Sequence, residues 1–212
     1  MTGGAEGDAA PDARAPEPHE ELRVVEGQAW PDGTGQWTYV AVVENPSDEL
    51  AYFSDAFDVQ AVTADGTVLD TGTTYSTVAP GGRAALVGSF RDLTGLGAQT
   101  ITVQVPETAT IVDPGSVGFF EVQHAEVSTD GEGRPAVVGS AVSRFTQEQR
   151  DPEVIAVLRD PGGAIVHVAT SGIYEVVAPG ATAQFVAHTF GEMPADVVPE
   201  VFVVPTGVLQ GP

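Results

Sequence analysis

The stretch Tyr75-Ser76-Thr77-Val78-Ala79-Pro80-Gly81 recurs 99 residues later as Tyr174-Glu175-Val176-Val177-Ala178-Pro179-Gly180. Proline fixes φ at each turn and glycine permits the chain reversal, so each copy predicts two strands joined by a tight turn. Upstream, Asp65-Gly66 corresponds to Asp160-Pro161-Gly162-Gly163, and downstream Phe90 corresponds to Phe190. Because strands and turns recur in the same order, we predict a duplicated unit of about 100 residues.

Apolar and polar residues alternate between these turns, which predicts half-buried strands and few helices. The clearest runs are residues 36–44, 57–63 and 100–105. In the first run, Trp37, Tyr39, Ala41 and Val43 alternate with Thr38, Val40, Val42 and Glu44. We expect one face of each strand to lie in a core and the other to face water.

We therefore predict an all-β protein of two tandem immunoglobulin-like antiparallel β-sandwich domains after a disordered N-terminal tail. The tail is residues 1–21, acidic and rich in Pro and Ala, with no Val, Ile, Leu or aromatic residue to bury. It is either an ordinary terminus or a stalk that holds the domains away from a membrane or wall. The first domain is expected at residues 22–107, and the second, a repeat of the first, at residues 117–206.

Composition excludes several classes of partner and chemistry. The 212 residues include 30 acidic and eight basic side chains, for a net charge of −22. This charge repels nucleic-acid phosphates and anionic lipids, so neither is expected as a partner. The absence of cysteine excludes disulfides and thiol chemistry. No apolar run approaches the roughly 18 residues that span a bilayer, so no direct membrane insertion is expected.

Segments of the first domain resemble the FxLYD-type immunoglobulin-like domains of prokaryotic cell-envelope proteins. They are Val42-Val43-Glu44-Asn45-Pro46-Ser47-Asp48-Glu49, Ala64-Asp65-Gly66-Thr67-Val68-Leu69 and Val78-Ala79-Pro80-Gly81. The resemblance is partial, since the eponymous motif would fall on Val59-Gln60-Ala61-Val62-Thr63, which does not keep it. Members of this group are extracytoplasmic and mostly of unknown function. The resemblance therefore implies a secreted protein or one anchored to the cell surface.

Asp70 is the one concrete catalytic candidate. It lies in Val68-Leu69-Asp70-Thr71-Gly72-Thr73, which looks like the catalytic loop of aspartic proteases. Such a carboxylate works only with a second carboxylate that shares its proton. Ala169 stands where the repeat would place that partner, so catalysis would require a homodimer that pairs two copies of Asp70. The alternative, which we favour, is an ordinary aspartate on the solvent side of a hairpin strand.

Metal-binding signals are weak. The four histidines, His19, His124, His167 and His188, lack the close spacing of metal-ligand pairs. The acidic loops at residues 31–33 and 128–133 would suit weak calcium binding, but both are equally typical of plain Asp-Gly turns. We expect no cofactor and assign no catalytic, cofactor-binding or metal-binding residue.

One cluster of aromatic residues has two interpretations. The cluster comprises Trp37, Tyr39, Tyr52, Phe53 and Phe57. These side chains would form a sugar or peptide platform if exposed, but large aromatic residues on alternating strands are more often buried. We expect most of the cluster to be core.

Together these observations predict a non-catalytic, extracytoplasmic binding or spacer module of the cell envelope. It would contact a protein partner of unknown identity through loops or sheet edges. One alternative is a structural subunit that assembles through its edge strands. The other is the dimeric aspartic-type protease that uses Asp70.

Overall fold

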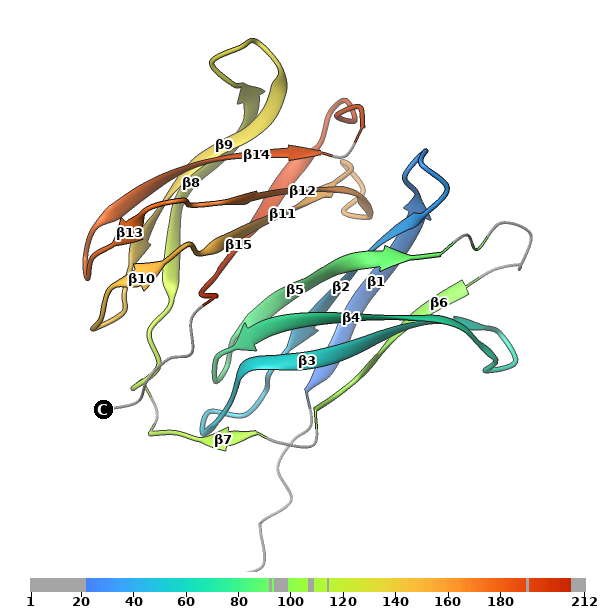
Figure 1. The fold of residues 1–212 in the computed structure, drawn as a ribbon, viewed down its shortest axis with the longest axis horizontal. Helices are drawn as coiled ribbons and strands as arrows, with labels where there is room; N and C mark the ends of the chain where they lie inside the picture. Colours follow the sequence, from blue (N-terminus) through green and yellow to red (C-terminus); the bar gives the residue numbers. More distant parts are fainter. Residues whose placement is uncertain are drawn as a thin grey trace, which may run out of the picture.

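The computed structural model describes residues 22–91, 93, 99–106, 109–113, 115–189 and 191–206. Within these residues the protein is all-β, and no helix is present (Figure 1). The predicted tail at residues 1–21 and the predicted equivalent of Phe90, Phe190, lie outside the described residues.

The strands fall into two groups along the chain. The first strand group is β1 (Arg23–Pro31), β2 (Trp37–Glu44), β3 (Leu50–Thr63), β4 (Val68–Val78), β5 (Arg83–Phe90), β6 (Gln99–Gln104) and β7 (Thr110–Ile111). The second strand group is β8 (Phe120–Thr129), β9 (Pro135–Ser143), β10 (Gln149–Arg150), β11 (Glu153–Arg159), β12 (Ile165–Gly172), β13 (Val176–Val177), β14 (Thr182–Thr189) and β15 (Val198–Val204). The predicted strands at residues 36–44, 57–63 and 100–105 are confirmed by β2, β3 and β6.

The first strand group forms two antiparallel sheets around an apolar core. One sheet has the order β1-β2-β5 and the other the order β4-β3-β6, while β7 pairs with the start of β3. Tyr39, Phe57, Leu86 and Phe90 are each at most 1% exposed in this core. Strand β7 lies between the two predicted domains, residues 22–107 and 117–206, and its pairing with β3 ties this part of the chain to the first group.

The second strand group forms a six-stranded antiparallel sheet with the order β15-β11-β12-β14-β9-β8, together with the short pair β10-β13. This sheet curls around its own core. The pairing between β12 and β14 has only two residue pairs, Ala169 with Thr189 and Thr170 with His188. Its two edge strands, β15 and β8, come close to each other at the open side of the curl.

The two groups repeat one pattern of pairing. The orders β1-β2-β5 and β4-β3-β6 correspond to β8-β9-β14 and β12-β11-β15. The two Val-Ala-Pro-Gly turns also have the same hydrogen bond: Gly82 N–H donates to Ala79 O and Ala181 N–H donates to Ala178 O, both at 3.0 Å. The glycine of each motif has a positive φ, 62° in the first copy and 73° in the second. Both turns therefore reverse the chain in the same way, as the residue types require.

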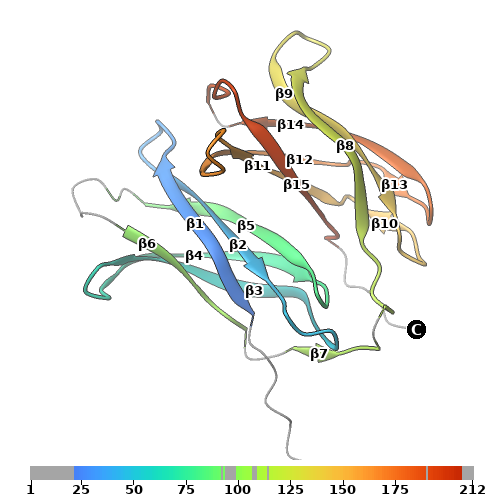
Figure 2. The same cartoon turned by 180° about the vertical axis from the view of Figure 1, so that it is seen from behind.

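The two groups pack against each other through sheet faces (Figures 1 and 2). A single apolar cluster contains Val40, Val42 and Ala85 from the first group and Ile155, Val157, Ile165, Val168 and Val204 from the second. Our expectation that one face of each strand meets water is wrong for β2, because Val40 and Val42 are fully buried in this cluster. Strands β2 and β11 are buried on both faces, which explains their nearly continuous apolar runs.

Four charged side chains join the two groups beside this apolar interface. Arg159 Nη1 donates to Glu26 Oε2 at 2.8 Å, and Arg159 Nε donates to Glu200 Oε2 at 2.9 Å. Arg83 Nη1 donates to Glu200 Oε1 at 2.6 Å. The hydrogen bond from Arg159 lowers the pKa of Glu26, and the bond to Glu26 raises the pKa of Arg159. The charges therefore hold β1 and β5 against β11 and β15.

Candidate functional site

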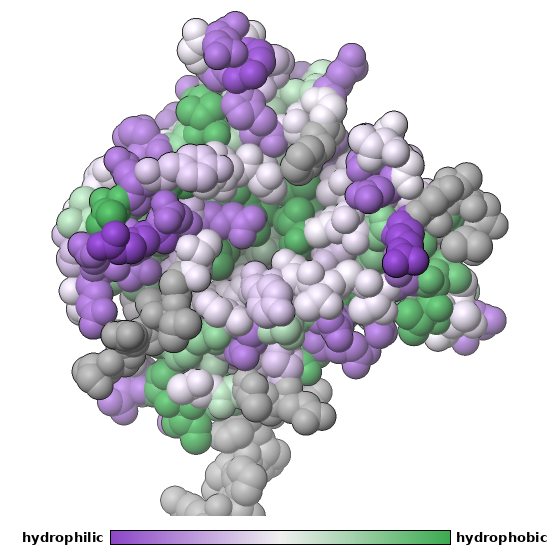
Figure 3. All heavy atoms as spheres, viewed as in Figure 1, coloured by the Kyte–Doolittle hydropathy of each residue, from purple (hydrophilic) through white to green (hydrophobic). Residues whose placement is uncertain are grey.

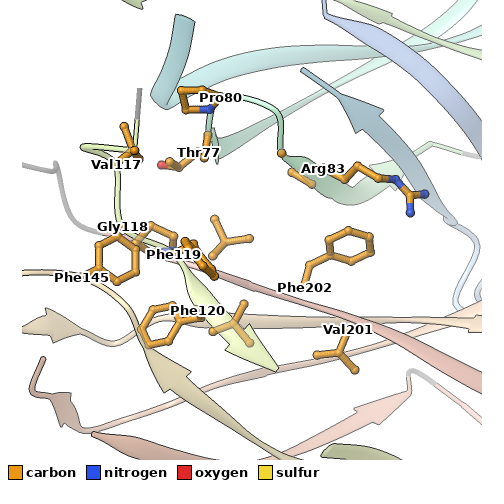
Figure 4. Close-up of a pocket in the computed structure, with 17 residues that line it drawn as sticks. Thr77, Pro80, Arg83, Val117, Gly118, Phe119, Phe120, Phe145, Val201 and Phe202 are labelled. Carbon is orange, nitrogen blue, oxygen red and sulfur yellow. The ribbon is translucent and has the colours of Figure 1, made fainter. Parts of the chain in front are cut away.

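An apolar groove lies where the two strand groups and their connecting segment meet (Figure 4). Its volume is about 430 Å³. The groove is lined by the turn between β4 and β5, by Gly115 and residues 117–119 of the connection, by Phe120 and Phe145, and by residues 201–205 at the end of β15. Elsewhere, Figure 3 shows hydrophobic residues as scattered patches within a mainly hydrophilic or neutral surface.

Aromatic side chains gather on one side of the groove (Figure 4). Phe120 and Phe145 are 8% and 5% exposed, and their ring centroids are 5.2 Å apart. Phe119 is 54% exposed. Gly118 lies directly against Phe145, because a Cβ on Gly118 would come within 2.6 Å of the Phe145 Cα. Glycine therefore allows the connecting segment to approach Phe145 and leaves Phe119 accessible at the groove.

The opposite side of the groove is formed by β15, whose residues Val201 and Phe202 are labelled in Figure 4. Side chains at alternate positions of β15 pack in two different places. Val201 and Val203 pack on the core of the second group, whereas Phe202 and Val204 belong to the interface between the groups. Strand β15 is thus held from both faces, so this side of the groove is preformed.

The groove has little polar chemistry of its own. Arg83 is the charged residue among those that line it, and Arg83 is paired with Glu200. The hydroxyl of Thr77 accepts a hydrogen bond from Ser54 N–H at 3.1 Å. The arrangement can bury apolar groups, but its lining supplies neither a general base nor an activated nucleophile.

Asp70, the catalytic candidate, lies on β4 away from the residues that line this groove. It is half-buried rather than fully on the solvent side. Its Oδ2 accepts a hydrogen bond from Arg91 N–H at 2.7 Å, and its Oδ1 accepts one from Thr71 N–H at 2.9 Å. The carboxylate thereby ties β4 to the chain just beyond β5. Ala169, at the repeat position, is fully buried on β12.

The two acidic loops considered for calcium use their carboxylates within their own hairpins. Asp130 Oδ1 accepts hydrogen bonds from the N–H groups of Glu132 and Arg134, at 2.8 and 2.9 Å. The backbone bond from Arg134, assisted by its side chain, lowers the pKa of Asp130 to about 2. Asp32 Oδ1 likewise accepts from Thr34 N–H at 2.7 Å. No group of three or more His, Asp or Glu residues suited to a metal occurs in the described part of the chain. Calcium binding stays a prediction.

The histidines with described positions lie on three different strands. His124 is on β8, His167 on β12 and His188 on β14, while His19 is outside the described residues. The His167 ring lies 5.2 Å from the Trp30 ring at the interface. His188 Nε2 is 3.7 Å from Asp130 Oδ2, beside a second cavity of about 570 Å³.

The expectation that most of the aromatic cluster is core is confirmed for three of its five members. Tyr39, Tyr52 and Phe57 are at most 4% exposed. Trp37 packs against the same core, and Phe53 is half-buried. The exposed aromatic residue at the groove is Phe119, which sequence reasoning missed. The run Gly118-Phe119-Phe120 carries a signal in retrospect, because two adjacent phenylalanines cannot both face the core of one strand.

No protein-family model matches this chain, and no curated protein matches it either. The described residues contain no helix long and apolar enough to cross a membrane.

Proposed function

We propose that this protein is a non-enzymatic binding module that holds an apolar segment of a partner protein in the groove between its two strand groups. The groove carries this proposal, because it combines a preformed strand, an exposed phenylalanine and a lining without free charge. Pockets of this kind gain affinity from burial of apolar surface.

The proposal includes two tandem immunoglobulin-like sandwiches. Support comes from the strand orders, since an immunoglobulin-like sandwich pairs its second strand with its fifth and its third with its sixth. The pairs β2-β5 and β3-β6 match this scheme. The pairs β9-β14 and β11-β15 match it too when the two-residue strands β10 and β13 are left out of the count. The common hydrogen bond of the two Val-Ala-Pro-Gly turns supports a duplication. An extracytoplasmic location at the cell envelope is part of the proposal, and the FxLYD resemblance supports it.

The buried interface also supports a spacer role. Sheet faces rather than a flexible connection join the two groups, so the molecule would present its groove at a defined orientation to whatever it is attached to.

The test is selection of random peptides displayed on phage against the immobilised protein. Peptides are selected on the original protein, and the affinity of each selected peptide is then measured on the original protein and on the Phe119→Asp variant. Phe119 is exposed, so the variant is expected to fold, and far-ultraviolet circular dichroism checks this. We expect enriched apolar peptides whose affinity falls at least about tenfold on Phe119→Asp.

Two results would contradict the proposal. Selected peptides that bind both proteins equally would remove the groove as the site. Casein proteolysis that disappears in an Asp70→Asn variant would contradict the non-enzymatic part and restore the protease alternative.

A further inference from the structure

The groove has one wall from each strand group. The first group supplies residues between Thr77 and Ala84, at the turn from β4 to β5. The second group supplies Phe120, Phe145 and residues 201–205, and the connecting segment supplies the rest. A segment that lies in the groove contacts both walls, so it loses contacts whenever the two groups part.

The groove is continuous with the apolar contact between the groups. Val204 lines the groove and belongs to the apolar cluster that joins the groups, and Phe202 packs on the same cluster. Val42, also in this cluster, does not line the groove, but its pairing partner on β5 is Ala85, the neighbour of the groove residue Ala84. A shift at the contact would therefore move the first wall relative to β15.

The charged side chains hold the same two walls together. Arg83 lines the groove, and its Nη1 donates to Glu200 Oε1 on β15 at 2.6 Å. Arg159 of the second group bonds both to Glu200 and to Glu26 of the first group. Arg159, Glu26 and Glu200 are not among the residues that line the groove. Contacts outside the groove thus fix the separation of its walls.

We propose that occupancy of the groove is coupled to docking of the two strand groups, so that a bound segment holds the groups together and their separation releases it. This inference rests on the proposed function and specifies its regulation. A ligand that contacts both walls binds the docked state more tightly, and by linkage it shifts the docking equilibrium in return. Its apparent affinity falls in proportion to the docked fraction.

Two variants disturb docking without altering the lining of the groove. Val42→Asp places a carboxylate in the apolar contact, and Arg159→Glu puts a third carboxylate beside Glu26 and Glu200. The probe is a fluorescein-labelled peptide selected on the original protein whose binding requires Phe119. Both variants should weaken this peptide at least about tenfold in fluorescence anisotropy, which corresponds to a docked fraction of at most about one tenth.

Each variant has a matched control. Val68→Asp and Arg134→Glu make the same substitutions where the residue is 47% exposed and the side chain is 63% exposed, respectively. Both controls should bind the peptide like the original protein. Far-ultraviolet circular dichroism checks folding, and Arg159, which belongs to neither core, tests the coupling if Val42→Asp unfolds.

Solution X-ray scattering tests the reverse effect. Saturating peptide should reduce the enlarged radius of gyration of Val42→Asp toward that of the original protein. Full affinity in a variant with an enlarged radius, or a radius that stays enlarged with peptide bound, would overturn the coupling and leave the groove a binding site. An unchanged radius in both variants would also overturn it, because the groups would not part. If no selected peptide depends on Phe119, the proposed function fails and this inference fails with it.

Discussion

Tyr39 shows how closely single residues are fitted in the first core. A Cβ on Gly72 or Gly88 would come within 2.6 or 2.3 Å of the Tyr39 side chain. Its ring centroid is 4.5 Å from that of Phe90. The hydroxyl is buried and has no hydrogen-bond partner among the described residues. Burial, with a smaller effect from Asp58, raises the pKa of Tyr39 to about 12. The Tyr39 ring therefore stabilises the core by packing, whereas its hydroxyl contributes no hydrogen bond.

We expect Tyr39→Phe to leave the free energy of unfolding unchanged or to raise it by about 1 kcal/mol, because an unpaired buried hydroxyl is removed. Tyr39→Ala, which also removes the ring, should lower that free energy by about 3–5 kcal/mol. Urea denaturation followed by circular dichroism measures both changes. A loss above about 1 kcal/mol in Tyr39→Phe would mean that the hydroxyl is bonded in solution.

At the scale of elements, charged residues connect strands that the chain keeps far apart. Glu26 on β1 and Arg83 on β5 meet Arg159 on β11 and Glu200 on β15. The side chain of Arg159 is 17% exposed, so water screens this pair less than a surface ion pair. Two of the eight basic residues of the chain lie here, and together with Glu26 and Glu200 they form a network without net charge.

The network predicts a pH dependence of stability. The pKa of Glu26 is lower in the folded state, so its contribution is present above the unfolded pKa of about 4.3 and is lost as the pH falls through the folded value. Glu26→Gln should lower the free energy of unfolding by about 1 kcal/mol at pH 7. This difference from the original protein should shrink as the pH falls below about 4.

Thermal melts from pH 7 to pH 3 measure this difference, with Glu132→Gln as a variant outside the network. A deficit in Glu26→Gln that stays constant down to pH 3 would show that the carboxylate charge is not the cause.

For the whole molecule, the decisive feature is the apolar contact between the two strand groups. Val40 and Val42 from one group meet Ile155 and Val157 from the other, and all four are at most 4% exposed. The contact encloses side chains on both faces of β2 and β11. The two groups are therefore expected to unfold as one cooperative unit.

Val42→Asp should separate the groups, because a carboxylate would be buried at the contact without a partner. We expect two unfolding transitions in place of one and a larger radius of gyration in solution X-ray scattering. Val68→Asp, at a site that is 47% exposed, makes the same substitution outside the contact and should leave both quantities unchanged. A single unchanged transition in Val42→Asp would show that the groups do not stabilise each other.

Much of the local structure was predictable from the chain. Alternation at residues 36–44, 57–63 and 100–105 predicted β2, β3 and β6, and the two Val-Ala-Pro-Gly motifs predicted turns that have the same hydrogen bond. These features depend on neighbouring residues, because side-chain alternation and backbone φ are local properties. The predicted core role of Tyr39, Tyr52 and Phe57 was confirmed for the same reason.

The sequence by itself thus determined an all-β chain with repeated turns, a strongly acidic surface and no thiol chemistry. Only the tertiary structure decided that Val40 and Val42 face a second sheet instead of water, that Asp70 bonds to Arg91 N–H, and that Phe119 lies beside the edge of β15. These contacts join residues far apart in the chain. Periodicity reports which residues share a face of a strand, but it carries no information about what packs on that face.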